Sequence, residues 1–220
     1  MSAAAAAMPA APAGPNLTPQ QKFILESFNS EVYVANRMDI QDTPLYDTVV
    51  ISNTGSNNVL SPLTSFLFTN VGPQSGKTYA QTNMAQPQKL NAPEAFAIFG
   101  FSFRYSENLA IVDLYNVLNG FAFEFWLGQK NYQRGPIWTY NAGGGVYGTA
   151  TAASNLTILN NGNPTRQGMH RLGINVVIEN QMSFYGLLNG NQYTMAASTS
   201  GGTGITYQMV LRGLYARGVQ

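Results

Sequence analysis

The sequence predicts an all-β protein: a single jelly-roll-like antiparallel β-sandwich, preceded by a disordered or extended N-terminal arm and one short helix. Apolar or alternating segments recur along the chain at the spacing typical of short strands. Clusters of Asn, Gly, Ser and Pro separate these segments. The connections at 70–94 and 141–155 are long, which favours a jelly roll over a simple meander.

The N-terminal region divides into an arm and a helix. Residues 1–17 are a low-complexity run of Ala, Pro and Gly with little apolar surface to bury, so we expect this arm to be disordered or extended when free. A short helix is predicted from Thr18 to Phe28, because Thr18 can cap it and Pro19 suits its first position. We expect two parts: a flexible arm, 1–17, and one sandwich domain, 18–220.

The rest of the chain is predicted as strands and turns. The predicted strands are Val32–Ala35, Tyr46–Ser52, Thr64–Thr69, Ala95–Tyr105, Ala110–Leu118, Phe121–Leu127, Ile137–Tyr140, Leu156–Leu159, Leu172–Glu179, Met182–Leu188 and Ile205–Ala216. Asn119-Gly120 is a strong type I′ turn signal, since both residues tolerate positive φ. It predicts a hairpin between the segments on either side of it.

The aromatic stretch 121–148 has the clearest pattern. Its first seven residues alternate Phe or Leu with Ala, Glu and Trp, as in a strand with one buried face. Trp126 and Trp138 both lie in this stretch. Exposed aromatic side chains stack on sugar rings or anchor protein contacts. Arg134 between them favours a protein contact.

The composition is poor in charge. Asp, Glu, Lys and Arg make up 10% of the residues, against about 25% in average soluble domains, and the net charge is +1. Such a surface predicts burial against other subunits, with an amide-rich extracellular β-protein as the alternative. The balance also argues against specific nucleic-acid recognition. No apolar run reaches the roughly 18 residues of a membrane helix, so no transmembrane segment is predicted.

Two features suggest a nucleotide-binding or metal-binding site, but neither has the residues that such a site needs. The segment GPQSGKT, Gly72–Thr78, is one residue short of a phosphate-binding P-loop, and a polar, Pro-containing segment follows it instead of an apolar helix. His170 is the single histidine and cannot form a multi-His metal site alone. We interpret it as part of an exposed loop at a strand entry, with a small basic contact spot as the alternative.

The acidic residues give no catalytic or metal motif. Asp39 and Asp42 lack the EF-hand pattern and are interpreted as a charged loop that pairs with Arg212 or Arg217 of a neighbouring subunit. Glu124 is the carboxylate we would test for glycoside hydrolysis, although a surface or interface role fits it better. With no cysteine, disulfides and thiolate metal sites are excluded. No catalytic residue, cofactor or metal is therefore predicted, and the protein is not expected to be an enzyme.

Four features occur together in this sequence: the Ala/Pro arm, the glycine- and amide-rich turns, the low charge and the long apolar last strand. In these features the chain resembles the capsid and capsid-associated jelly-roll proteins of viruses, including bacteriophages. The resemblance implies a sandwich of two four-stranded sheets, symmetric self-association, and an arm that orders against neighbours or the shell interior.

We therefore expect a structural protein of a virion, assembled in the host cytoplasm as a major, vertex or cementing subunit. Its expected partners are copies of itself and other capsid proteins. The residues predicted to form assembly contacts are Leu17 in the arm and Trp126, Arg134 and Trp138 for lateral contacts. The alternative is a carbohydrate- or receptor-binding β-sandwich that holds a glycan on Trp126 or Trp138.

Overall fold

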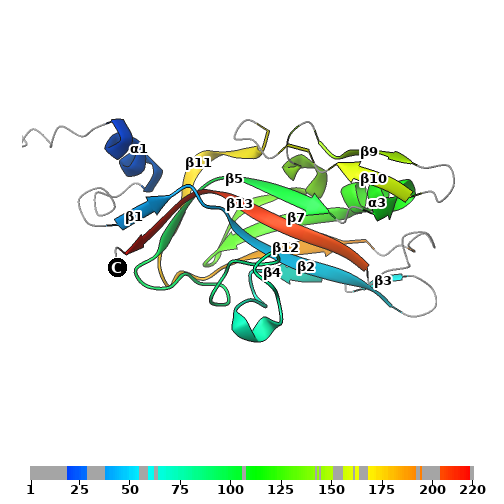
Figure 1. Ribbon diagram of the computed structural model, residues 1–220, viewed down its shortest axis with the longest axis horizontal. Helices are drawn as coiled ribbons and strands as arrows, with labels where there is room; N and C mark the ends of the chain where they lie inside the picture. Colours follow the sequence, from blue (N-terminus) through cyan, green and yellow to red (C-terminus); the bar gives the residue numbers. More distant parts are fainter. Residues whose placement is uncertain are drawn as a thin grey trace, which may run out of the picture.

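The computed structural model is shown in Figure 1. It describes residues 19–28, 38–54, 59–61, 64–105, 108–141, 143, 145–150, 156–160, 162–163, 168–191, 194 and 204–218. The expected arm, 1–17, with its predicted contact residue Leu17, lies outside the described residues. The predicted strand at 32–35 also lies outside them.

Strands dominate the described chain, as the sequence predicts. The elements are α1 Pro19–Phe28, β1 Met38–Gln41, β2 Leu45–Thr54, β3 Val59–Ser61, β4 Thr64–Leu67, η2 Pro73–Ser75, β5 Ala95–Tyr105, β6 Asn108–Ala110, α3 Ile111–Gly120, β7 Phe121–Leu127, β8 Lys130–Pro136, η3 Ile137–Tyr140, β9 Tyr147–Ala150, β10 Leu156–Asn160, β11 His170–Ile178, β12 Phe184–Gly190 and β13 Gly204–Gly218.

The two main sheets have jelly-roll topology. One sheet has the order β11-β5-β13-β2-β3, with β1 also paired to β13, and the other has the order β4-β12-β7-β8. In chain order, the jelly-roll strands are β2, β4, β5, β7, β8, β11, β12 and β13. The first of these pairs with the last, the second with the seventh, the third with the sixth and the fourth with the fifth, all antiparallel. This pattern of one long hairpin rolled into two sheets defines a jelly roll, and the predicted fold class is confirmed.

An aromatic core joins the two sheets. The alternation predicted for 121–127 is correct, because Phe121, Phe123 and Phe125 of β7 are buried. Phe125 meets Phe101 of β5 with ring centroids 5.2 Å apart. Phe123 meets Phe103 of β5 at 5.1 Å. These tilted and edge-to-face contacts are the favoured aromatic geometries, and they hold the sheets face to face.

The predicted N-terminal helix is present and packs on the outside of the larger sheet. Phe28 of α1 is buried in a second hydrophobic cluster with small residues of β5 and β13, including Ala97 and Ala216. Phe23 of α1 lies against Phe99 of β5, with ring centroids 5.8 Å apart. Because small side chains line the sheet here, the helix packs closely over it. Figure 1 shows α1 near the end of the sandwich where β13 ends.

The predicted hairpin at Asn119-Gly120 is wrong, because the segment before it is helical. α3 covers Ile111–Gly120, and its buried or half-buried residues follow the helical spacing of three and four. These residues are the buried Asp113 and Val117 and the half-buried Leu114, Asn116, Leu118 and Gly120. Asn119 and Gly120 therefore end a helix, and β7 begins directly after them. β6 pairs with β10, which pairs with β9, in a small third sheet beside α3 (Figure 1).

The segment after β7 also differs from the prediction. The polar segment between the predicted strands Phe121–Leu127 and Ile137–Tyr140 makes a further strand, β8, which joins β7 through a two-residue turn at Gly128 and Gln129. Gly128 has φ 58°, the left-handed conformation that such turns require. The predicted strand at Ile137–Tyr140 is instead the 3₁₀ helix η3. Its three residues per turn bury both Ile137 and Tyr140 on one side.

Candidate binding surface and edge groove

A row of aromatic side chains crosses the outer face of the β4-β12-β7-β8 sheet. Phe66 of β4 contacts Tyr185 of β12, with ring centroids 5.9 Å apart. Tyr185 lies directly opposite Trp126 of β7, and their rings are stacked at 6.2 Å with planes 8° apart. Phe66 is 51% exposed, whereas the other two are half-buried. We call these three residues the aromatic row.

The carboxylate of Glu124 lies beside the aromatic row and is held there by hydrogen bonds and an ion pair. Glu124 precedes Trp126 by two residues and therefore faces the same side of β7. Its Oε2 accepts from Trp126 Nε1 at 2.9 Å and from Asn131 Nδ2 at 3.2 Å, and its Oε1 lies 3.1 Å from Arg134 Nε. Only 9% of Glu124 is exposed. Both carboxylate oxygens are engaged, so we assign Glu124 a role in fixing Trp126 and the β7–β8 hairpin.

The structure brings together two of the predicted contact residues and separates the third. Trp126 and Arg134 meet through Glu124 on the outer sheet face. Trp138 lies on η3, beyond Pro136, which pairs with Ala122 at the far end of β7. From the strand rise, Trp138 is roughly 15 Å from Trp126 along the hairpin. Trp138 is 53% exposed, so any contact that it makes with a partner would be separate from the aromatic row.

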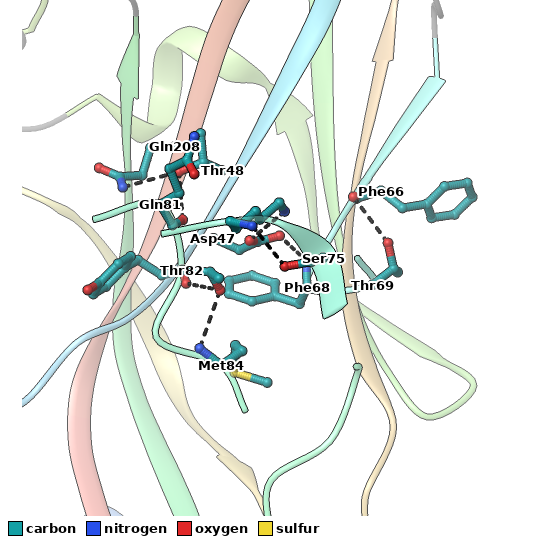
Figure 2. Close-up of polar contacts among 12 residues, drawn as sticks. Asp47, Thr48, Phe66, Phe68, Thr69, Ser75, Gln81, Thr82, Met84 and Gln208 are labelled. Carbon is teal, nitrogen blue, oxygen red and sulfur yellow. Dashed lines mark hydrogen bonds and ion pairs between the residues drawn. The ribbon is translucent and has the colours of Figure 1, made fainter. Parts of the chain in front are cut away.

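A buried ion pair ties the connection after β4 to β2. Asp47 points into the sandwich edge and is fully buried, and its Oδ1 lies 2.7 Å from Lys77 Nζ. The backbone N–H of Phe68 donates to Asp47 Oδ2 at 2.7 Å. Figure 2 shows Asp47 beside Ser75 and Phe68, at the centre of this polar network. Burial raises the pKa of Asp47 above 3.8, and the bonds from Lys77 and the backbone partly oppose this rise.

The P-loop-like segment is confirmed as an ordinary loop. Its lysine, Lys77, is held by an ion pair with the buried Asp47. Its Pro73–Ser75 portion is a single 3₁₀ turn, and Ser75 Oγ donates to the Gly72 carbonyl at 2.8 Å. No long helix follows with its N-terminus towards the loop. The nucleotide-binding geometry is therefore missing from this described segment.

The same connection covers the edge of β2. The Asn83 side chain accepts from Tyr46 N at 2.9 Å and donates to the Pro44 carbonyl at 2.7 Å. Thr48 Oγ1 donates to the Gln81 carbonyl at 2.7 Å. Figure 2 shows Gln208 of β13 reaching the same threonine. Covering an edge strand in this way blocks its pairing with another chain.

An open groove of about 530 Å³ lies where β2 and β4 face each other at this edge. Its lining is mostly hydroxyl and amide side chains from β2, β4 and the 69–81 connection. A smaller groove of about 300 Å³ lies between α1 and β11 and includes Phe23 and Ile174. A third, of about 340 Å³, lies on the outer face of β2, β5 and β13. We refer to the first as the edge groove.

The remaining candidates have structural partners. His170 lies at the start of β11 and packs on Tyr140, with ring centroids 4.7 Å apart. Asp39 lies on strand β1, not on a loop, and its Oδ2 lies 3.1 Å from Arg217 Nε of the same chain. The prediction that Asp39 pairs with an arginine of a neighbouring subunit is therefore wrong, because Arg217 of the same chain makes this pair. Across the described ranges, no three His, Asp or Glu side chains are grouped to hold a metal ion.

Sequence reasoning missed Phe66, Tyr185 and the Asp47–Lys77 pair. Phe66 and Tyr185 become neighbours only through the β4–β12 register, which joins strands more than a hundred residues apart. The sequence of Thr64–Leu67 gives no local signal for an exposed Phe66, because its exposed and buried residues alternate in the structure while its polar and apolar residues do not. None of the helices in the part of the chain that the structure describes is long and apolar enough to cross a membrane.

Comparison with known proteins gives no match. No protein-family model, curated protein or solved structure is significantly similar to this chain. The function is therefore argued from the fold and from the residues on its surface.

Proposed function

We propose that this protein is a self-associating structural subunit of a virion shell. The observation that carries the proposal is the aromatic row on the outer face of a jelly-roll sheet. Phe66, Tyr185 and Trp126 cross this face together, and the neighbouring Glu124 and Arg134 neutralise each other. Aromatic residues and arginine are enriched at the centres of protein interfaces.

The area of this sheet face limits the contact that two copies can make through it. β7, β8 and β12 are seven residues long and β4 is four. A four-stranded sheet of this length presents roughly 400 Å². Stable dimers bury about 800 Å² on each partner, so this face alone supports a weak contact. Weak contacts repeated by symmetry are sufficient for a closed shell.

The low charge supports the same proposal. Ten per cent of the residues are charged and the net charge is +1, so repulsion between copies is small. Other apolar side chains are exposed on separate faces, among them Ile174, Tyr115 and Trp138. Several faces are thus suited to contacts with copies of the chain or with other shell proteins. In this account the protein works mechanically, in the virion, and catalyses no reaction.

Electron microscopy of the purified chain tests the proposal. We expect rings or closed particles at high protein concentration, and fewer of them after deletion of residues 1–17. The matched pair Phe66→Lys and Tyr115→Lys separates the sheet face from general surface effects, because both replace an exposed aromatic residue. Phe66→Lys should abolish the particles and Tyr115→Lys should reduce them less. Particles unaffected by Phe66→Lys would contradict the role of the aromatic row.

The geometry gives less support to a sugar site on the two tryptophans. One face of the Trp126 ring is covered by Tyr185, and its Nε1 donates to Glu124. Trp138 is exposed but lies apart from Trp126 on η3. A glycan pull-down in which Trp126→Phe or Trp138→Phe removes binding would favour the carbohydrate-binding function at these residues.

A further inference from the structure

The edge groove has the volume of a small-ligand site. Its volume of about 530 Å³ lies within the usual range of about 300–1,000 Å³ for ligand pockets. One wall is β2 around Val50, the other is β4 around Ser65, and the 69–81 connection forms its base. The groove is anchored at that base by the buried Asp47–Lys77 pair.

Three hydroxyl groups of the groove already donate their protons within the protein. Thr48 donates to the Gln81 carbonyl, Thr69 to the Phe66 carbonyl at 3.3 Å, and Ser75 to the Gly72 carbonyl. Figure 2 shows the side chains of Thr48, Thr69 and Ser75, all three of which line the groove. A hydroxyl has one proton but two lone pairs. Thr48 Oγ1 already accepts from Gln208 Nε2 at 3.2 Å and Ser75 Oγ from Lys77 N at 3.2 Å, so each of these two oxygens can accept one further bond. The groove therefore favours a ligand that donates hydrogen bonds.

The groove offers no net charge to a ligand. Lys77 is the one charged residue among those that line it, and its ammonium lies 2.7 Å from the Asp47 carboxylate. An anionic ligand would compete with Asp47 for this ammonium, and a cationic ligand would meet it as a like charge. A neutral ligand meets neither obstacle. Val50, 42% exposed, adds an apolar contact on the β2 wall.

We propose that the edge groove binds a neutral oligosaccharide of a few sugar rings. A sugar donates many hydroxyl protons, carries no charge, and presents C–H faces that pack on apolar side chains. Asn70, which is exposed at the groove, adds an amide that both donates and accepts. This site shares Phe66 with the aromatic row, although the Phe66 ring points away from Ser75 in Figure 2. It is compatible with a shell subunit that also holds a host-surface glycan.

Saturation-transfer NMR on the full chain tests this inference. The probes are neutral trisaccharides with glucose, galactose, mannose or N-acetylglucosamine units, and sialyllactose as the charged comparison. We expect transfer to at least one neutral trisaccharide and weaker transfer to sialyllactose. Transfer to none of the neutral probes, or to sialyllactose alone, would overturn the inference.

Two variants then place the bound sugar. Asn70→Trp fills the groove and should weaken binding at least about tenfold, and Asn70→Ala should weaken it less. Asn180→Trp is the matched control, because Asn180 is equally an exposed Asn in a turn, but outside the groove. Equal affinity in Asn70→Trp and Asn180→Trp would show that the sugar binds elsewhere and would overturn the inference.

Discussion

Trp126 and Tyr185 lie directly opposite each other on adjacent antiparallel strands, with their rings parallel to within 8°. Cross-strand aromatic pairs stabilise a sheet by roughly 0.2–1 kcal/mol relative to alanine pairs. Here the pair also fixes an apolar surface on the outside of the sandwich. That outer face is the feature from which the proposed assembly role follows.

Glu124 is predicted to hold Trp126 in this position. Glu124→Ala leaves the half-buried Trp126 Nε1 without its acceptor and should lower the free energy of unfolding by about 2 kcal/mol. Glu124→Gln keeps an acceptor and loses only the pair with Arg134, which is 78% exposed. It should therefore cost less than about 1 kcal/mol. Urea unfolding at one fixed protein concentration measures both values.

Two controls sharpen the Glu124 test. Glu179→Ala removes an exposed glutamate in the turn after β11 and should leave stability nearly unchanged. A Trp138→Phe background leaves Trp126 as the one indole, so its fluorescence reports its own surroundings. An unchanged emission spectrum and stability in Glu124→Ala would show that the carboxylate does not position Trp126.

The Asp47–Lys77 pair predicts an asymmetric pair of mutational effects. Lys77→Met leaves a fully buried carboxylate without its cation and should cost about 3–5 kcal/mol. Asp47→Asn should cost less, because Lys77 is 15% exposed and can extend its ammonium to water. The double variant should be more stable than Lys77→Met alone. Chemical unfolding of the three variants gives the coupling energy, and additive effects would contradict a direct interaction.

The pH dependence of Lys77→Met follows from the pKa of Asp47. Burial raises this pKa above 3.8, so between 3.8 and the raised value the folded protein binds a proton more tightly than the unfolded chain does. Stability from this group is therefore lost as pH rises through that window. Removal of Lys77 raises the pKa further. The stability gap between wild type and Lys77→Met should shrink from neutral pH towards acid, and a constant gap would contradict this assignment.

Gly213 is predicted to be required for the contact between β13 and β5. A Cβ at this position would lie 1.9 Å from the Ala97 carbonyl oxygen, at the bulge between Arg212 and Gly213. Gly213→Ala should cost about 3 kcal/mol or more, since backbone on both strands must move. Gly173→Ala is the control, because a Cβ there meets no atom within 4 Å. Thermal unfolding should separate the two variants clearly, and equal midpoints would contradict the observed packing.

Much of the fold follows from local sequence patterns. The predicted bounds of Ala95–Tyr105 and Phe121–Leu127 are those of β5 and β7, because apolar and aromatic residues concentrate there. The α1 helix also follows from its start signal. Local patterns do not determine which strands pair, and the jelly-roll order rests on contacts such as β2 with β13, far apart in the chain.

The errors have physical causes. Ile111–Gly120 is rich in β-favouring residues, but burial of Val117 and half-burial of Leu114 and Leu118 select the helical period. Tertiary packing therefore outweighs strand propensity in α3. Strand β8 was missed because its polar residues lie on a sheet edge, where one neighbouring strand supplies its backbone hydrogen bonds.

The candidate surface was only partly predictable. Alternation within β7 placed Trp126 and Glu124 on one face, which is correct. The aromatic row needed Phe66 and Tyr185, which come from two other strands. Lys77 was identified in a P-loop-like segment, but its buried partner Asp47 lies thirty residues away in sequence. Such partners are determined by the fold and not by spacing.

The most direct test of the central claim is the solution mass of the full chain by light scattering, measured against protein concentration for wild type and Phe66→Lys. The account predicts that the wild-type mass rises with concentration to a defined oligomer or shell, and that Phe66→Lys stays at lower mass. A wild-type chain that remains at its monomer mass of 23.8 kDa over the whole concentration range would contradict a self-associating shell subunit.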